Sequence, residues 1–197
     1  MKPNLLPQTP SQTVGPFFAF ALAARQYGYD FPQIAGSAIA TPDAPGEHIR
    51  VTGRVIDGEG VPIPDSLIEV WQADASGRYP GADAFDADGA FLGFGRYGTG
   101  TGPETRFTFD TVKPGGHDGE APHLNLIVTM RGLLLHAFTR LYFSDEAAAN
   151  ERCAVLALVP QERRRTLVAT REETPAGPLY RFDIHMQGPD ETVFFDV

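Results

Sequence analysis

Histidines are the residues of this sequence best suited to metal chemistry. There are five, and only His117 and His123 lie close together, in the segment HDGEAPHLN. Asp118 and Glu120 lie between them, so the segment could supply the two-histidine, one-carboxylate set that binds non-haem iron. The segment is irregular, however, and nothing in it fixes the geometry of such a site. We therefore favour a loop histidine and a strand histidine that make ordinary hydrogen bonds.

Other catalytic patterns are missing from the sequence. It has no G-x-S-x-G nucleophile elbow, no G-x-G-x-x-G at a strand-to-helix junction and no phosphate-binding loop. A single cysteine, Cys153, excludes an internal disulfide framework and a cysteine-built zinc site. It lies in a small apolar run, which predicts a buried, inert thiol.

The charge balance excludes two classes of partner. Sixteen Lys and Arg residues against 25 Asp and Glu residues give a net charge of −9. Such a chain is unsuited to coating nucleic acid or anionic membranes. No run approaches the 18 apolar residues of a membrane span, and no export signal is recognisable, so we expect a soluble, cytoplasmic protein.

The elements that must position these residues begin with an arm. Prolines and glycines dominate residues 1–16, which predicts an extended segment with no core of its own. Residues 17–28 repeat apolar side chains at helical spacing, Pro16 suits a first helical position, and Gly28 can end the helix. Residues 30–46 are predicted as a loop.

From residue 47 the pattern alternates as in β-strands. Strands are predicted at 47–57, 66–74, 104–112, 123–131, 135–143, 166–172, 179–187 and 191–197. A short helix capped by Ser144 follows the fifth of them. Residues 73–105 are predicted mostly as loop.

We therefore expect an all-β protein, a β-sandwich of short, mostly antiparallel strands with an N-terminal arm and a few peripheral short helices. The expected organisation is one domain, residues 1–197, with the arm and helix in 1–46 and the sandwich in 47–197.

Several segments taken in order carry a family resemblance. VTGRVIDGEGVPIPDSLIEVWQAD, GRY, GFGR, FDTVKPG, a histidine at the start of a strand and TRLYF follow one another between residues 47 and 145. This order resembles the intradiol ring-cleaving dioxygenases. LLPQTPSQTVGPFF, PDAPGEHI and YRFDIHMQGPDETVFFDV extend the match to nearly the whole chain and resemble the subunit of two-chain members that lacks iron. The resemblance implies a β-sandwich and, in active subunits, iron(III) bound by two tyrosines and two histidines.

This chain departs from the active pattern at decisive positions. Tyr79 matches the first tyrosine and His123 the first histidine, but His117 stands where the second tyrosine belongs and Asn125 where the second histidine belongs. Glu120 replaces an arginine of active chains. Iron(III) favours anionic oxygen ligands and a neutral amide is a poor one. The resemblance therefore implies a degenerate site, with no metal and no catalytic residue in this chain.

The resemblance also implies a partner. An iron(III)-bearing subunit of the same fold would face this chain, and the arm Thr13-Val14-Gly15-Pro16 would approach its small aromatic substrate. Arg131 matches an arginine that attracts the substrate carboxylate. The plainer interpretations are a helix start at Gly15 and Pro16, and a solvated turn arginine at Arg131.

Two alternatives stay open. The chain could be a self-sufficient metal-binding aromatic dioxygenase that uses Tyr79, His117, His123 and an acid. It could also be a purely structural β-sandwich subunit. A partner sequence with P-G-P-Y and H-x-H would separate the paired subunit from the structural one.

Overall fold

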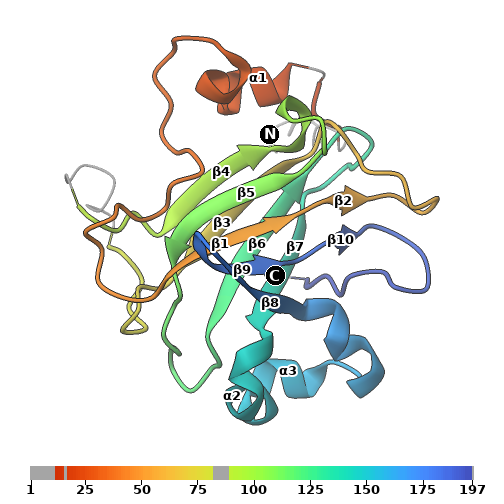
Figure 1. Ribbon diagram of the computed structural model, residues 1–197. Helices are drawn as coiled ribbons and strands as arrows, with labels where there is room; N and C mark the ends of the chain where they lie inside the picture. The colour runs from red at the N-terminus through yellow and green to blue at the C-terminus, as the bar shows by residue number, and fades with distance from the viewer. Residues whose placement is uncertain (1–11, 16, 82–88, 197) are drawn as a thin grey trace, which may run out of the picture.

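The chain folds around one large β-sheet (Figure 1). The computed structural model describes residues 12–15, 17–81 and 89–196. The eight strands of the sheet lie in the order β4-β3-β6-β7-β8-β9-β1-β5, and β10 and β2 form a separate pair. The strands are β1 (His48–Gly53), β2 (Val55–Ile56), β3 (Leu67–Gln72), β4 (Phe94–Gly98), β5 (Phe107–Val112), β6 (His123–Thr129), β7 (Ala137–Phe143), β8 (Val168–Thr174), β9 (Gly177–Arg181) and β10 (Ile184–His185).

The expected all-β class is confirmed, but a sandwich of two sheets is not. The single sheet curls until its edge strands β4 and β5 approach each other, where Tyr97 and Phe109 have ring centroids 6.2 Å apart. The strand pairing is also more mixed than predicted, because β1–β9 and β7–β8 in the large sheet and the separate pair β2–β10 are parallel. Alternation in a sequence indicates which face of a strand is buried, and it leaves the pairing of strands open.

The main core lies inside this curled sheet. Alternate residues of each strand point inward, as the patterns predict. Val51 of β1, Phe107 and Phe109 of β5, and Leu124 and Leu126 of β6 are fully buried there. The other side chains of β3, β4, β6 and β7 point to the opposite, outer face of the sheet. The candidate site lies on that outer face.

The N-terminal helix is shorter than predicted. α1 (Phe18–Leu22) gives way to the 3-10 turn η1 (Ala24–Tyr27) because Ala23 leaves helical geometry. Gly28 ends the turn as predicted, in the left-handed conformation with φ 81°. The predicted loop 30–46 also contributes Ile39, which is fully buried in the core.

The rest of the chain differs from the predictions at several places. Residues 73–105 contain the unpredicted strand β4, and the described part of the strand predicted at 191–197 makes a single bridge, between Phe195 and Phe138. The helical segment consists of η4 (Ser144–Glu146), α2 (Ala147–Arg152) and α3 (Ala154–Leu158). Ser144 does not cap it, because its hydroxyl accepts the backbone N–H of Arg171 at 3.0 Å.

Cys153 is buried beneath the helices, as predicted, and its thiol lies 3.9 Å from the Tyr142 hydroxyl. None of the helices in the described ranges has the length and apolar character needed to cross a bilayer. A further 3-10 segment, η5 (Gln161–Leu167), leads from α3 into β8, and η3 (Thr99–Thr101) follows β4.

Candidate functional site

Two loops meet at the start of β6. Gly77 has φ 82° and lies so close to the second loop that a Cβ atom there would be 2.0 Å from the carbonyl oxygen of Gly116. The second loop then reverses at Asp118 and Gly119, both with positive φ, and the Glu120 N–H donates to the His117 carbonyl at 2.8 Å. This tight turn brings His117, Glu120 and His123 to the same end of the sheet as Tyr79.

Three of the predicted positions form a hydrogen-bonded triad. Nδ1 of His123 lies 2.8 Å from the Ala121 carbonyl, so Nδ1 carries the proton and Nε2 is an acceptor. The Tyr79 hydroxyl donates to that Nε2 at 3.2 Å, and Asn125 Nδ2 donates to the hydroxyl oxygen at 2.9 Å. Asn125 Nδ2 also contacts the Trp71 carbonyl at 3.2 Å. The order of donation is therefore Asn125 to Tyr79 to His123.

His117 touches this triad only through its ring. The imidazole lies edge-on to the Tyr79 ring with centroids 5.0 Å apart. Its Nδ1 donates to the Gly77 carbonyl at 2.7 Å, and its Nε2 lies 3.4 Å from a carboxylate oxygen of Asp118. Both ring nitrogens are thus directed away from the Tyr79 hydroxyl.

The structure adds one residue that the sequence did not single out. Arg140 of β7 is the register partner of Asn125, and its Nη1 donates to Glu120 at 2.8 Å. The same Glu120 oxygen lies 3.5 Å from His123 Nε2. A guanidinium therefore stands beside these positions, although Glu120 stands where the resemblance implies an arginine. Only the pairing of β6 with β7 shows that Arg140 lies beside Asn125.

Burial keeps the triad uncharged. Burial raises the pKa of the half-buried Tyr79 hydroxyl above its ordinary value, which outweighs the hydrogen bond from Asn125. Burial also lowers the pKa of His123 below its ordinary value. Near neutral pH, with no metal bound, the phenol keeps its proton and the imidazole is neutral.

The triad does not fit iron(III). The His123 lone pair that a metal would need already accepts a hydrogen bond, and Asn125 presents its NH₂ group toward Tyr79. Among the described residues, no three His, Cys, Asp or Glu side chains gather as a metal-ligand group. These side chains satisfy one another, and we derive no metal chemistry for this chain.

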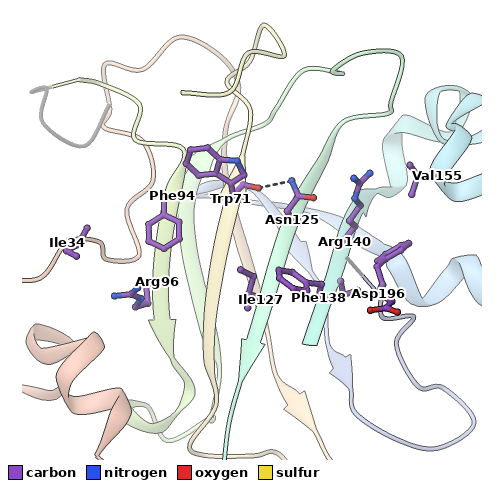
Figure 2. A pocket seen from close by; sticks show the side chains of 12 residues that line it. Ile34, Trp71, Phe94, Arg96, Asn125, Ile127, Phe138, Arg140, Val155 and Asp196 are labelled. Atoms are coloured by element: carbon purple, nitrogen blue, oxygen red, sulfur yellow. Dashed lines mark hydrogen bonds between the residues drawn. The ribbon is translucent and has the colours of Figure 1, made fainter. Parts of the chain in front are cut away.

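A cleft of about 770 Å³ extends from the triad over the outer face of the sheet (Figure 2). The register aligns Trp71, Asn125 and Arg140 in one row across β3, β6 and β7, and Ile127 and Phe138 pair in a second row. The cleft is lined by these residues together with Ile34, Phe94, Arg96, Thr139, Val155, Phe195 and Asp196.

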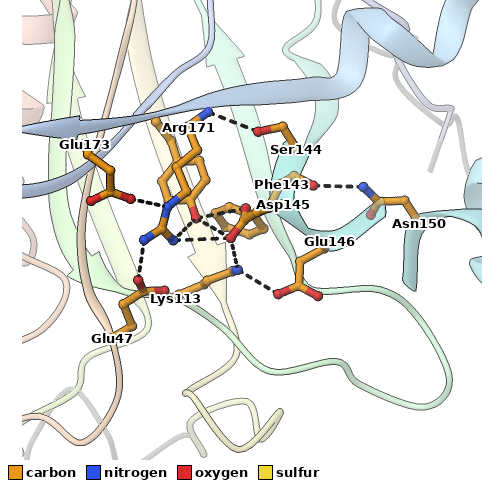
Figure 3. Close-up of polar contacts among 10 residues, drawn as sticks. Glu47, Lys113, Phe143, Ser144, Asp145, Glu146, Asn150, Arg171 and Glu173 are labelled. Atoms are coloured by element: carbon orange, nitrogen blue, oxygen red, sulfur yellow. Dashed lines mark hydrogen bonds and ion pairs between the residues drawn. The ribbon is translucent and has the colours of Figure 1, made fainter. Parts of the chain in front are cut away.

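A polar cluster fixes the base of the loop that carries His117 (Figure 3). Lys113 Nζ lies 2.6 Å from both Asp145 and Glu146, and its side chain is 12% exposed. Arg171 bonds Glu47 at 2.8 Å and Asp145 at 3.2 Å. Because the cluster joins the ends of β5 and β7 to the middle of β8, it holds the start of residues 113–117 in place.

The residues predicted to approach substrate lie elsewhere. The Thr13 hydroxyl accepts the Gly132 N–H at 2.8 Å, which places the arm against the turn that carries Arg131. Gly15 is exposed and has open space around it, whereas Pro16 lies outside the described residues. Arg131 is exposed and pairs with Asp65. This surface follows the end of β6 at Thr129, whereas the triad lies at its start, about 20 Å away along the strand.

Comparisons with known proteins agree on one family. A family model described as "Dioxygenase" matches residues 36–188. The protocatechuate 3,4-dioxygenase alpha chain of Burkholderia cepacia is 55% identical over 98% of both chains. The beta chain from the same organism is 37% identical, covering 79% of this chain and 71% of its own. The dioxygenase domain of a carbohydrate-binding fusion protein from Streptomyces sp. SirexAA-E is 25% identical with a TM-score of 0.62, covering 94% of this chain and 99% of its own.

Proposed function

The chain belongs to the dioxygenase family that its residues 36–188 match, and from this premise we propose that it is the alpha subunit of a protocatechuate 3,4-dioxygenase. In this proposal the chain is one domain, residues 1–197, with a β-sandwich from residue 47, and it works in the cytoplasm. A lone buried thiol suits that reducing compartment. Its partner is the beta chain, which shares the fold.

In this proposal the reaction requires both chains, this one and the beta chain. The partner holds iron(III), and protocatechuate with O₂ gives 3-carboxy-cis,cis-muconate, so that both oxygen atoms enter between the two hydroxyl-bearing carbons. This chain supplies no metal ligand. Its arm, with Gly15 and Pro16, and its Arg131 complete the substrate-binding surface of the partner's site. An arginine there offsets the repulsion between a chain of net charge −9 and an anionic substrate.

One observation carries this proposal, the hydrogen bond between Thr13 and Gly132. It joins the arm to the turn after β6 and makes one surface from two segments, with Thr13 and Gly132 lying 119 positions apart in sequence. Because that surface lies about 20 Å from the triad along β6, it is unsuited to serve the chain's own degenerate site. A surface that faces a second chain accounts both for the contact between the arm and this turn and for the distance of the surface from the triad.

The decisive experiment compares the chain alone with the chain co-expressed with its beta partner. Iron content, visible absorption and O₂ uptake with protocatechuate are measured for both. We expect iron near one equivalent per pair, tyrosinate-to-iron(III) colour and O₂ uptake in the complex only, because the lone chain has no tyrosinate pair to bind the metal.

The same experiment can refute the proposal. Stoichiometric iron and colour in the lone chain would instead support a self-sufficient metalloenzyme. Full activity of the beta chain by itself, with unchanged kcat/KM, would reduce this chain to a structural subunit.

A further inference from the structure

Asp65 and Arg131 are cross-strand neighbours just beyond the paired part of β3 and β6. The antiparallel register of these two strands ends with Leu67 opposite Thr129. Two residues further along each strand, the same register brings Asp65 opposite Arg131. The Asp65 carboxylate accepts the Nε–H of Arg131 there, although the two residues lie 66 positions apart in sequence. The contact therefore follows from strand pairing.

The segment before β3 holds the carboxylate of this pair in place. Ser66, which follows Asp65, is fully buried and exchanges two hydrogen bonds with Thr99. Its N–H donates to the Thr99 hydroxyl at 3.1 Å, and its carbonyl accepts the Thr99 N–H at 2.8 Å. The Thr99 hydroxyl also donates to the Ile63 carbonyl at 2.7 Å. The backbone on both sides of Asp65 is thus tied to η3, and the Asp65 side chain is only 28% exposed.

The arginine lies on a turn whose backbone is also fixed. Gly132 follows Arg131 with φ 93°, and the Leu133 N–H donates to the Met130 carbonyl at 3.4 Å across the turn. The Gly132 N–H donates to the Thr13 hydroxyl. These contacts set the backbone but leave the Arg131 side chain, which is 55% exposed. A long exposed side chain samples many rotamers unless a partner restricts it.

Asp65 contacts one side of the guanidinium and leaves its end open. The hydrogen bond to Asp65 uses Nε of Arg131. Within the part of the chain that the structure describes, Nη1 and Nη2 of Arg131 make no hydrogen bond. These two nitrogens form the end of the planar fork and can donate side by side to both oxygens of one carboxylate. An arginine anchored at Nε loses less side-chain entropy when it binds such an anion.

We propose that Asp65 is a positioning residue, which orients the Arg131 guanidinium so that Nη1 and Nη2 meet the carboxylate of the aromatic substrate. This inference rests on the proposed function, because it takes the substrate of the partner's site as the anion. Asp65 does not touch the substrate, and its own negative charge repels an anion nearby. Orientation outweighs this repulsion, so removal of Asp65 should weaken substrate binding. Removal of a carboxylate that acted only by repulsion would strengthen it.

The kinetics of the complex with the beta chain measure this sign. Asp65→Ala should raise the KM for protocatechuate about threefold with kcat nearly unchanged, because it frees a binding group and no reacting group. Asp65→Asn keeps an oxygen that can accept from Nε, so it should raise KM less than Asp65→Ala does. Asp190→Ala is the matched control, since it removes the carboxylate paired with exposed Arg165 and should leave KM unchanged.

The double variant Asp65→Ala with Arg131→Gln tests whether Asp65 acts through the arginine. Its KM should be no higher than that of Arg131→Gln alone, because there is no guanidinium left to orient. A further increase in KM would show that Asp65 acts independently of Arg131 and would overturn the positioning role.

Two inhibitors separate the orientation of Arg131 from a general disturbance of the surface. 4-Hydroxybenzoate carries the carboxylate of the substrate, and phenol does not. Asp65→Ala should raise the inhibition constant of 4-hydroxybenzoate about threefold and leave that of phenol unchanged. Thermal unfolding of each complex checks that the variants are folded and assembled. Equal weakening of both inhibitors would overturn the inference, because the substitution would then have changed the shape of the site.

The remaining outcomes distinguish the positioning role from the proposed function. An unchanged or lower KM in Asp65→Ala, together with a raised KM in Arg131→Gln, would overturn the role of Asp65 and leave the proposed function standing. An unchanged KM in Arg131→Gln would remove Arg131 from the substrate site, and the role of Asp65 would be refuted with it. An unmodified complex that does not consume protocatechuate would refute the proposed function and every inference that rests on it.

Discussion

Asn125 donates its side-chain amide to the Tyr79 hydroxyl over 2.9 Å, and that hydroxyl lies 3.2 Å from His123 Nε2. In our proposal, the amide takes the place of a metal as the group that satisfies the tyrosine oxygen. A buried polar site that has lost its ion is costly unless its lone pairs find other partners. The side chains of this site have become partners of one another, and four tests follow from the described contacts.

The Tyr79–Asn125 contact should stabilise the fold. Tyr79→Phe and Asn125→Ala are each expected to lower the free energy of unfolding by about 1–2 kcal/mol, since each leaves a buried polar group without its partner. In a double-mutant cycle the coupling energy should be about 1 kcal/mol, measured by urea unfolding. Additive effects of the two substitutions would contradict the direct contact.

Restoring two ligands should restore metal binding. The double variant His117→Tyr with Asn125→His re-creates the two-tyrosine, two-histidine set of active chains, and we expect it to bind iron(III) with visible tyrosinate absorption. The unmodified chain and each single variant should remain colourless. Equal iron content in all four proteins would show that these positions are not the former ligand positions.

Arg131 should matter for substrate affinity in the complex. Arg131→Gln is expected to raise the KM for protocatechuate about tenfold, with little change in kcat, because it removes a binding charge and no reacting group. Arg165→Gln is the matched control, since Arg165 is also exposed and paired with a single carboxylate, Asp190. The kinetics of that control should be unchanged. An equal loss in both variants would assign the effect to net charge alone.

The polar cluster at Lys113 should make stability depend on pH. Burial raises the pKa of Asp145, but hydrogen bonds from Lys113 and Tyr180 outweigh it and leave the pKa below its ordinary value. The ionised carboxylate therefore stabilises the fold above the unfolded-state pKa of about 3.9, and the stabilisation is lost as pH falls through the lower folded-state pKa.

Asp145→Asn isolates this contribution. We expect it to cost about 2 kcal/mol of unfolding free energy at pH 7, and the difference from the unmodified chain should shrink below about pH 4. Asp110→Asn is the control, because the Arg50–Asp110 pair is about half exposed and should contribute less than about 1 kcal/mol. If the difference in unfolding free energy between Asp145→Asn and the unmodified chain stays the same at low pH, the substitution acts through a change in packing and not through the loss of charge.

Local patterns in the sequence predicted most of the strands and their buried faces. Val51, Phe109 and Leu126 point inward because alternation along a strand is a local property. Strand β4 was missed because Gly95 and Gly98 interrupt its pattern, and its place in the sheet depends on pairing with β3. The predicted sandwich is not confirmed for the same reason, since pairing joins segments that are distant in sequence.

At the candidate site, the family resemblance of the sequence predicted that Tyr79, His117, His123 and Asn125 are former ligand positions, because a motif names residue types at fixed positions. Only the tertiary structure decided that His117 hydrogen-bonds away from the other three, that Arg140 lies beside Asn125, and that Arg131 and the arm form a separate surface. These are relations across strands and loops, and they depend on register and on turns with positive φ, which a linear pattern does not encode.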